Sequence, residues 1–294
     1  MMDRIQYCIF DPTGNITALV ETAVDVADQP AVASWIMERE PDVEQVGFIT
    51  YESSDGDVSV PISLRMAGGE FCGNATMCAA ALSAIHGGLK SGAVYVKISG
   101  ASAPITVSLE QKAAFSYSAA VSMPPALRIG MVSLQPSGMA GASGAIEAAG
   151  TEQINAMLTL PVVEMEGISH IIIEPDSGFL GIKEDPELAE ALIKQWCSVL
   201  GADCLGMMFL GEGAALRPLT PLVYVPGADT MFWENSCASG SAAAGMYLAS
   251  KAGSPVDVTF DEPAGRLRVE SDPAAGRTVL HGSVTLRGSI ISSR

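Results

Sequence analysis

The stretches Cys72-Gly73-Asn74-Ala75-Thr76 and Cys237-Ala238-Ser239-Gly240-Ser241 decide the fold, because they present one arrangement twice. Each places a cysteine directly before a run of small residues rich in alanine, which predicts a helix that begins at the thiol. The two cysteines lie 165 residues apart (237 − 72) in a chain of 294 residues. The repeat therefore predicts an internal duplication, with two similar lobes that share one cleft.

Both halves of the chain show a similar order of elements around the cysteine. In the first half, the apolar periodicity predicts helices at 29–40 and 75–86 and strands at 4–10, 16–21, 45–51, 58–66, 93–99, 104–110 and 115–122. In the second half, it predicts helices at 186–200 and from the second cysteine motif to about Ser250, and strands at 158–166, 169–174, 205–211, 218–226, 256–260, 266–270 and 278–285. A hairpin turn is expected at Ser54-Asp55-Gly56, and a loop at 135–150.

This pattern predicts an α+β fold built from two lobes. Residues 1–130 are expected to form the N-terminal lobe, which carries Cys72, and residues 131–294 the C-terminal lobe, which carries Cys237. Exchange of a C-terminal strand between the two lobes is compatible with this division.

Composition excludes several classes of partner. The hydrophobic content of 48% is enough for a packed core, and the net charge of −17 repels nucleic acid and anionic membranes. No export segment and no apolar run of about 18 residues is visible, so we expect a cytoplasmic protein without a membrane partner. The six cysteines are then expected to be reduced, and they lack the paired spacing of a zinc site.

A thiol at a helix N-terminus points to acid and base chemistry. Unpaired N–H groups and the helix dipole favour a thiolate there, which predicts a lowered thiol pKa, and the same groups can hold a carboxylate. With two such ends facing each other, Cys72 and Cys237 would lie on opposite sides of the α-carbon of an amino acid. One sulfur would remove the α-proton and the other would return a proton to the opposite face. This arrangement inverts the stereocentre without a cofactor.

The motifs resemble those of the diaminopimelate epimerase superfamily. Glu70-Phe71-Cys72-Gly73-Asn74-Ala75 looks like its first cysteine motif, and Cys237-Ala238-Ser239-Gly240, preceded by Glu234, resembles the second. The Gly14-Asn15 turn and the segment Gly167-Ile168-Ser169-His170 also match in order. The resemblance implies a diaminopimelate epimerase-like fold, with two pseudo-symmetric lobes that are each a curved β-sheet or barrel around a central helix.

The same resemblance implies roles for individual residues. Cys72 and Cys237 become the catalytic acid and base pair. The α-carboxylate is held by backbone groups at Gly73, Asn74, Ala238 and Ser239. The amine or side chain of the substrate is contacted by Asn15 and Glu234, with His170 as a further candidate and a structural histidine as the alternative there. The family implies a small-molecule amino acid as substrate, no pyridoxal phosphate or other cofactor, no metal, and a homodimer.

Departures from the family pattern bear on the substrate. Met77 stands where the first motif usually carries arginine, and no arginine precedes the second motif in Gly227-Ala228-Asp229-Thr230-Met231-Phe232-Trp233. An acid and two aromatics suit the distal carboxylate of diaminopimelate poorly. The expectation is that Asp229 pairs with an imidazolium while Phe232 or Trp233 stacks on the ring. The sequence therefore favours a histidine racemase, with diaminopimelate epimerase as the alternative.

Other readings stay open at this point. Proline racemases carry histidine where this chain has Asn74, and the phenazine-biosynthesis-like isomerases lack the paired cysteines. A cysteine hydrolase or transferase would use Cys237 as nucleophile and His170 as base. A binding protein without catalytic activity is a further alternative.

Overall fold

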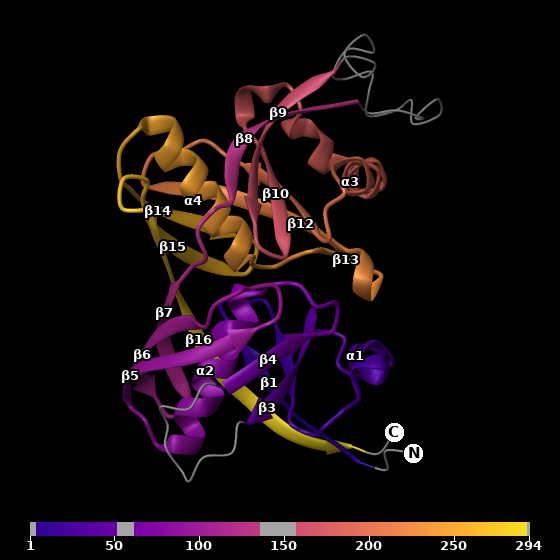
Figure 1. Cartoon of the computed structure of the whole chain (residues 1–294), viewed down its shortest axis with the longest axis vertical. Helices are drawn as coiled ribbons and strands as arrows, with labels where there is room; N and C mark the ends of the chain where they lie inside the picture. The colour runs from indigo at the N-terminus through magenta and orange to yellow at the C-terminus, as the bar shows by residue number, and fades with distance from the viewer. Residues whose placement is uncertain (1–3, 52–61, 136–156, 293–294) are drawn as a thin grey trace.

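Two lobes lie one above the other along the longest axis of the computed structural model (Figure 1). The structure describes residues 4–51, 62–135 and 157–292. The lower lobe surrounds the helix α2 (Gly73–Gly87), and the upper lobe surrounds the helix α4 (Ala238–Ala252). Each cysteine motif thus starts the central helix of one lobe, as the repeat predicted.

The other elements follow the predicted order closely. The lower lobe contains α1 (Gln29–Met37), β1 (Ile5–Asp11), β2 (Thr17–Val20), β3 (Gln45–Tyr51), β4 (Ile62–Met66), β5 (Ser91–Ile98), β6 (Ile105–Ala113) and β7 (Ser116–Ser122). The upper lobe contains α3 (Pro186–Leu200), β8 (Arg128–Leu134), β9 (Leu158–Met165), β10 (Ile168–Ile173), β11 (Leu205–Leu210), β12 (Leu216–Val225), β13 (Thr230–Trp233), β14 (Val256–Glu262) and β15 (Gly265–Asp272). Four short 3₁₀ helices lie in the described connections, at Val26–Asp28, Pro175–Ser177, Leu180–Glu184 and Pro226–Ala228.

One long strand joins the lobes. The last strand, β16 (Arg277–Ser292), pairs with β15 near its start and then with β7 and β1 of the lower lobe. Its register on β1 runs from Thr285, opposite Asp11, to Ser292, opposite Ile5. The predicted strand at 278–285 is therefore extended, and the C-terminal segment completes the sheet of the N-terminal lobe.

The central helices are buried because their side chains are small. The first ten residues of α2 and the first nine of α4 are buried, so strands pack around both helices. Each helix ends at a glycine in the left-handed region, Gly88 with φ 66° and Gly253 with φ 63°. Small residues thus let both helices lie at the centre of a lobe, and the core follows from this packing.

Two strands were not expected from the sequence. In β8, polar and apolar residues do not alternate clearly, and Gly130 interrupts the run. In β13, only four residues are extended, directly after Asp229, which has a positive φ of 50°. Helix α1 also ends three residues earlier than predicted. The expected turn at 54–56 lies outside the described residues, as does nearly all of the loop expected at 135–150.

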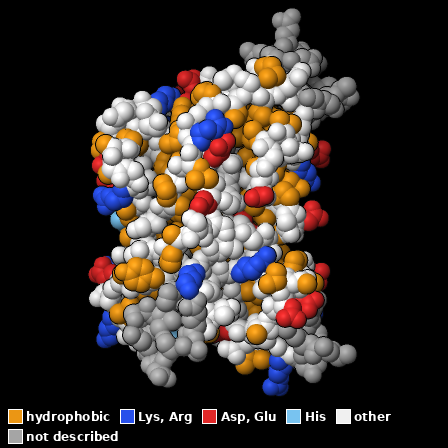
Figure 2. All heavy atoms as spheres, in the orientation of Figure 1, with side chains coloured by type: hydrophobic (Ala, Val, Ile, Leu, Met, Phe, Trp, Pro, Cys, Tyr) orange, Lys and Arg blue, Asp and Glu red, His pale blue; other side chains and the backbone are white. Residues whose placement is uncertain are grey.

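The division into domains at residue 130 stays a prediction, and that residue lies inside β8, which pairs with β9. In the described part of the chain, no helix is long and apolar enough to cross a membrane. Hydrophobic, acidic and basic side chains are interspersed on the face shown in Figure 2.

The packing of α4 on β15 can be tested at Gly245. A Cβ at this position would lie 2.5 Å from Cγ1 of Val269, so Gly245→Ala should force the helix and strand apart and destabilise the fold by about 1–3 kcal/mol. The matched control is Gly181→Ala, where no atom lies within 4 Å of the added Cβ. Denaturant unfolding should show a lower free energy of unfolding for Gly245→Ala and an unchanged one for Gly181→Ala. Equal stability of the two variants would contradict the close packing.

Candidate active site

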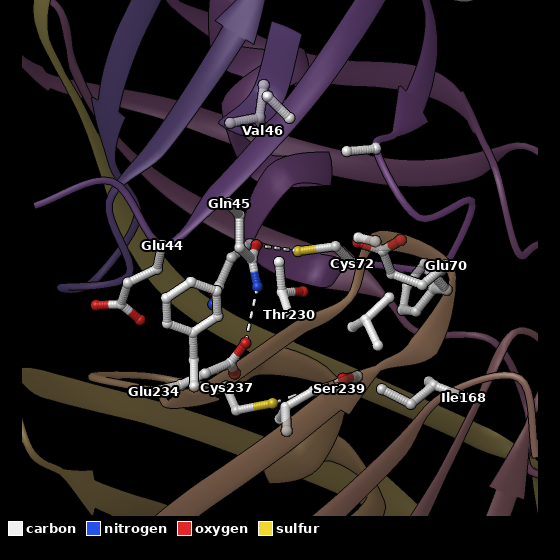
Figure 3. Close-up of a pocket in the computed structure, with 18 of the residues that line it drawn as sticks. Glu44, Gln45, Val46, Glu70, Cys72, Ile168, Thr230, Glu234, Cys237 and Ser239 are labelled. Atoms are coloured by element: carbon white, nitrogen blue, oxygen red, sulfur yellow. Dashed lines mark hydrogen bonds between the residues drawn. The ribbon is translucent and has the colours of Figure 1, made fainter. Parts of the chain in front are cut away.

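The two cysteine motifs meet at the N-termini of their helices. A Cβ added to Gly73 would lie 2.8 Å from the Cβ of Ala238, so the first turn of α2 contacts the first turn of α4. Cys72 caps α2, and its sulfur accepts a hydrogen bond from the N–H of Ala75 at 3.3 Å. Cys237 caps α4 and accepts from the N–H of Gly240 at 3.4 Å. Both thiols therefore lie at one junction between the lobes (Figure 3).

A cavity of about 50 Å³ lies at this junction. Seven of the nine predicted site residues line it: Cys72, Gly73, Asn74, Glu234, Cys237, Ala238 and Ser239. Apart from the thiols, its ionisable side chains are Glu44, Glu70 and Glu234, and the described lining holds no lysine, arginine or histidine. The cavity has room for only a few water molecules, so a bound amino acid requires side chains to move.

Gln45 connects the two sides of the cavity (Figure 3). The thiol of Cys72 donates to its Oε1 at 2.6 Å, and its Nε2 donates to Oε1 of Glu234 at 2.9 Å. No sequence motif marks this residue, because a glutamine at the start of a strand carries no pattern of its own. The amide occupies space between the two halves of the site, and an incoming ligand has to displace or engage it.

Glu234 is buried and only half satisfied. Its Oε1 accepts from Gln45, whereas Oε2 has no partner among the described residues. Burial raises its pKa to about 8, and the nearby charge of Glu44 adds to this rise. A positively charged group of a ligand would offset this cost and supply the missing donor.

The predicted lowering of the thiol pKa values is wrong for this ligand-free site. The N–H groups of Ala75 and Gly240 do lower the pKa values of Cys72 and Cys237, as expected. However, burial raises both pKa values by more, and the charge of Glu234 raises both further. Both cysteines are therefore thiols until a ligand changes the balance of charge.

Asn15 and Asn74 form hydrogen bonds that fix residues around the cavity. Asn15 does not line the cavity itself, but its Nδ2 donates to Oε2 of Glu44 at 3.0 Å. Asn235, which the sequence analysis did not select, bonds the same carboxylate through its main-chain N–H at 3.2 Å and its side chain. Asn74 donates to the carbonyl oxygen of Ser236 at 2.9 Å and so ties α2 to the second motif.

His170 lies apart from the cavity. It is fully buried in β10 and packs against Gly206, and its ring nitrogens have no partner among the described residues. Burial lowers its pKa to about 3, so the ring is neutral. Since it does not bond the Cys237 thiol, the structure offers no support for the hydrolase pair of Cys237 and His170.

The predicted contacts of Asp229 and Trp233 with the substrate side chain are also not found. Asp229 is exposed and does not line the cavity. Strand β13 alternates, so Phe232 faces the cavity whereas Trp233 faces the opposite side, where it stacks on Phe209 and donates to Glu190. Phe232 is thus the aromatic residue at the site, and Glu44 and Glu70 supply the acids.

Metal ligands are not clustered in this region. Among the described residues, no group of three or more histidine, cysteine, aspartate or glutamate side chains is arranged to hold a metal ion.

Comparison with known proteins places this site in a wider context. A family model described as "Histidine racemase CntK N-terminal domain" matches residues 4–290. A histidine racemase of Staphylococcus aureus (strain Mu50 / ATCC 700699) is 29% identical over 276 residues, which cover 91% of this chain and 88% of the relative.

Solved structures share the fold at low sequence identity. A hydroxyproline epimerase from Agrobacterium vitis is 11% identical with a TM-score of 0.64, and the match covers 99% of this chain and 93% of that one. A PhzF-family phenazine biosynthesis protein from Bacillus anthracis is 12% identical with a TM-score of 0.59, and the match covers 99% of both chains. The predicted fold class is therefore confirmed.

The placement of His170 outside the site can be tested with His170→Leu. Racemisation of the substrate at neutral pH should stay within about threefold of wild type, because His170 does not line the cavity and neither ring nitrogen bonds a group there. In wild type, the pKa of His170 is 6.5 in the unfolded chain and about 3 in the folded protein. The folded protein therefore keeps its full free energy of unfolding above pH 6.5 and loses part of it as the pH falls below 6.5, because the unfolded chain binds a proton that the buried ring does not.

As the pH falls from 6 to 4, the free energy of unfolding of the wild type should therefore decrease by about 1.4 kcal/mol per pH unit relative to that of His170→Leu. Urea unfolding at a series of pH values measures this difference. Parallel pH curves for the two proteins, or a loss of racemisation of about 100-fold in the variant, would contradict this placement.

Proposed function

Because the chain belongs to the histidine racemase family, we propose that it interconverts L- and D-histidine, with Cys72 and Cys237 as the two bases. The chain is an amino-acid racemase, and so an isomerase; its substrate and its mechanism are the proposal. The observation that carries the mechanism is the meeting of two cysteine-capped helix N-termini at one acidic cavity.

The helix ends suit an α-carboxylate. In each helix the third N–H group, of Ala75 or Gly240, bonds the cysteine sulfur. The N–H groups of the first two residues, Gly73 and Asn74 on one side and Ala238 and Ser239 on the other, are left to bind the carboxylate between the two helices. Aligned dipoles at both ends stabilise that negative charge and the charge that develops on the carbanion.

The acidic cavity suits the α-ammonium group. Glu234 lacks a donor at Oε2, and an ammonium group there would favour its carboxylate form. The same positive charge lowers the pKa values of both thiols and so allows one of them to ionise. The thiolate takes the α-proton, the opposite thiol gives its proton to the other face, and the two sulfurs exchange protonation states in one turnover.

The charges at the cavity favour histidine over diaminopimelate. A distal carboxylate would face Glu44 and Glu70 with no cation in the described lining, at a cost of several kcal/mol. Arg65 is bonded to Oε1 of Gln29 and to a main-chain carbonyl oxygen and does not line the cavity. An imidazole can instead donate to a carboxylate and lie against Phe232.

Diaminopimelate epimerase remains the second candidate, on the resemblance of the cysteine motifs alone. Assembly as a homodimer, a cytoplasmic location and independence of any cofactor stay predictions from the sequence.

The two-base mechanism predicts that either cysteine is indispensable. Cys72→Ser and Cys237→Ser should each lower racemisation of L-histidine by about 10³-fold or more, because a hydroxyl group is far less acidic than a thiol. The matched control is Cys197→Ser, since the buried Cys197 donates to the carbonyl oxygen of Ala202 and a hydroxyl group can do the same. Under reducing conditions, circular dichroism of the reaction mixture measures the decrease in the ellipticity of L-histidine as it racemises. Near-normal racemisation by either cysteine variant would rule out the two-base scheme.

The acidic cavity predicts the substrate preference. In deuterium oxide, kcat/KM for L-histidine should exceed that for LL-diaminopimelate by at least about 100-fold, because the distal carboxylate stays unpaired. Exchange of the α-proton, followed by NMR, measures both reactions with the same enzyme. A preference for diaminopimelate would overturn the substrate and leave the cysteine mechanism standing.

A further inference from the structure

A buried carboxyl group lies directly behind Cys237. Glu262 is the last residue of β14 and is only 6% exposed. Its Oε2 accepts a hydrogen bond from the main-chain N–H of Cys237 at 2.6 Å, and its Oε1 accepts from the hydroxyl group of Ser241 in the first turn of α4. The residue does not line the cavity, so it reaches the site only through Cys237 and α4.

This carboxyl group opposes the effect of the helix end on the thiol. The N-terminus of a helix favours a thiolate because its free N–H groups and its dipole are positive. In α4, ionised Glu262 takes up one of those N–H groups and places a negative charge at the same end. The charge of Glu262 accordingly raises the pKa of the Cys237 thiol, in addition to burial and to the charge of Glu234.

The Cys72 side differs. The acid closest to it in sequence, Glu70, lies two residues before the thiol and lines the cavity. Burial raises the pKa of Glu70, and its charge in turn raises the pKa of the Cys72 thiol. Glu234 acts on both thiols. Glu262 acts on Cys237 and is not among the groups that raise the pKa of Cys72. The surroundings of the two bases therefore differ at Glu262, whose carboxyl group accepts a hydrogen bond from the main-chain N–H of Cys237 itself.

We propose that Glu262 is a positioning residue that makes the two cysteines inequivalent: its ionised carboxyl group holds the proton on Cys237, so that Cys72 ionises first. The proposal rests on the two-cysteine mechanism above. The substrate enantiomer whose α-proton faces Cys72 then binds an enzyme in which Cys72 is a thiolate and Cys237 is a thiol. Its proton passes to the Cys72 thiolate, and the Cys237 thiol protonates the opposite face of the carbanion. To repeat this direction, one proton must move from Cys72 back to Cys237.

Ser241 allows the carboxyl group to change its protonation state without losing a hydrogen bond. Its hydroxyl group donates to a carboxylate, and it can accept from a protonated carboxyl group. Burial raises the pKa of Glu262 to about 8, so the bias on Cys237 sets in as the pH rises through this value. The ionisable groups that face Glu262 are Cys237 and Glu234, whereas the neighbouring Asp261 is exposed and paired with Arg266.

The experiment compares alkylation of the two thiols by iodoacetamide between pH 6 and pH 11, in the full-length protein without substrate, by peptide mass spectrometry. Glu262→Gln keeps an acceptor for the Cys237 N–H and a partner for Ser241 but removes the charge. In this variant the rate of Cys237 alkylation at a given alkaline pH should rise about tenfold or more, with the rate of Cys72 alkylation unchanged. Each cysteine in the variant is compared with the same cysteine in wild type, so the effect of burial on its alkylation is the same on both sides of the comparison. The control Asp261→Asn should change neither profile.

Ser241→Ala provides a second, milder variant. It removes one donor from the carboxylate and disfavours its ionised form, so the rate of Cys237 alkylation at a given alkaline pH should also rise, by a smaller factor. An unchanged Cys237 profile in both variants, or equal shifts of Cys72 and Cys237, would overturn the proposal. The readout requires no turnover, so it separates this proposal from the failure of the two-base mechanism, which the serine variants of the cysteines report.

The pH profile of kcat/KM for L-histidine adds a readout that a purely structural role would not move. In Glu262→Gln its alkaline-side inflection should shift to lower pH by about one unit, with folding unchanged by circular dichroism. A uniform loss of activity at every pH would instead show that Glu262 only supports the fold, and would also overturn the proposal.

Discussion

The contact between Gly73 and Ala238 is the constraint on which the rest of the structure depends. Two helix ends can approach so closely only if the residues in contact are as small as Gly73 and Ala238, and each helix lies at the centre of a lobe because it is built mostly from small residues. The surrounding strands, the glycine caps and the long strand β16 hold that contact in place. The thiols that cap the helices are thereby fixed on the two sides of one cavity.

Electrostatics at the cavity follow from the same burial. Helix N-termini are suited to anions, yet the ligand-free site is occupied by carboxyl groups and thiols whose pKa values are raised by burial. Burial disfavours negative charge in such a site, and its described lining holds no positive group. An amino acid brings both missing features, a carboxylate for the helix ends and an ammonium group for the acids, so the substrate completes the charge balance that its own reaction needs. Water and simple anions supply only part of this.

The sequence predicted the features that depend on local pattern. The duplicated motif placed Cys72 and Cys237 at two helix starts, and the fold class and the racemase activity followed from it. Features that depend on tertiary packing were missed. The direction of the thiol pKa shifts is set by burial, which no local pattern reports, and Gln45 enters the site from a strand that is distant from both motifs in sequence. For Trp233, one position along a short strand decided between cavity and core, and the register of β13 was not visible before its partner β12 was known.

The path of β16 has a consequence for how the protein is made. Ile5 pairs with Ser292, so the sheet of the lobe that is synthesised first lacks a strand until the ribosome has finished the other lobe. During translation, β1 and β7 present open edges, and such edges attract other chains. The high sequence separation of this pairing also favours slow closure. The sheet of the N-terminal lobe can therefore close only after β16 has been synthesised.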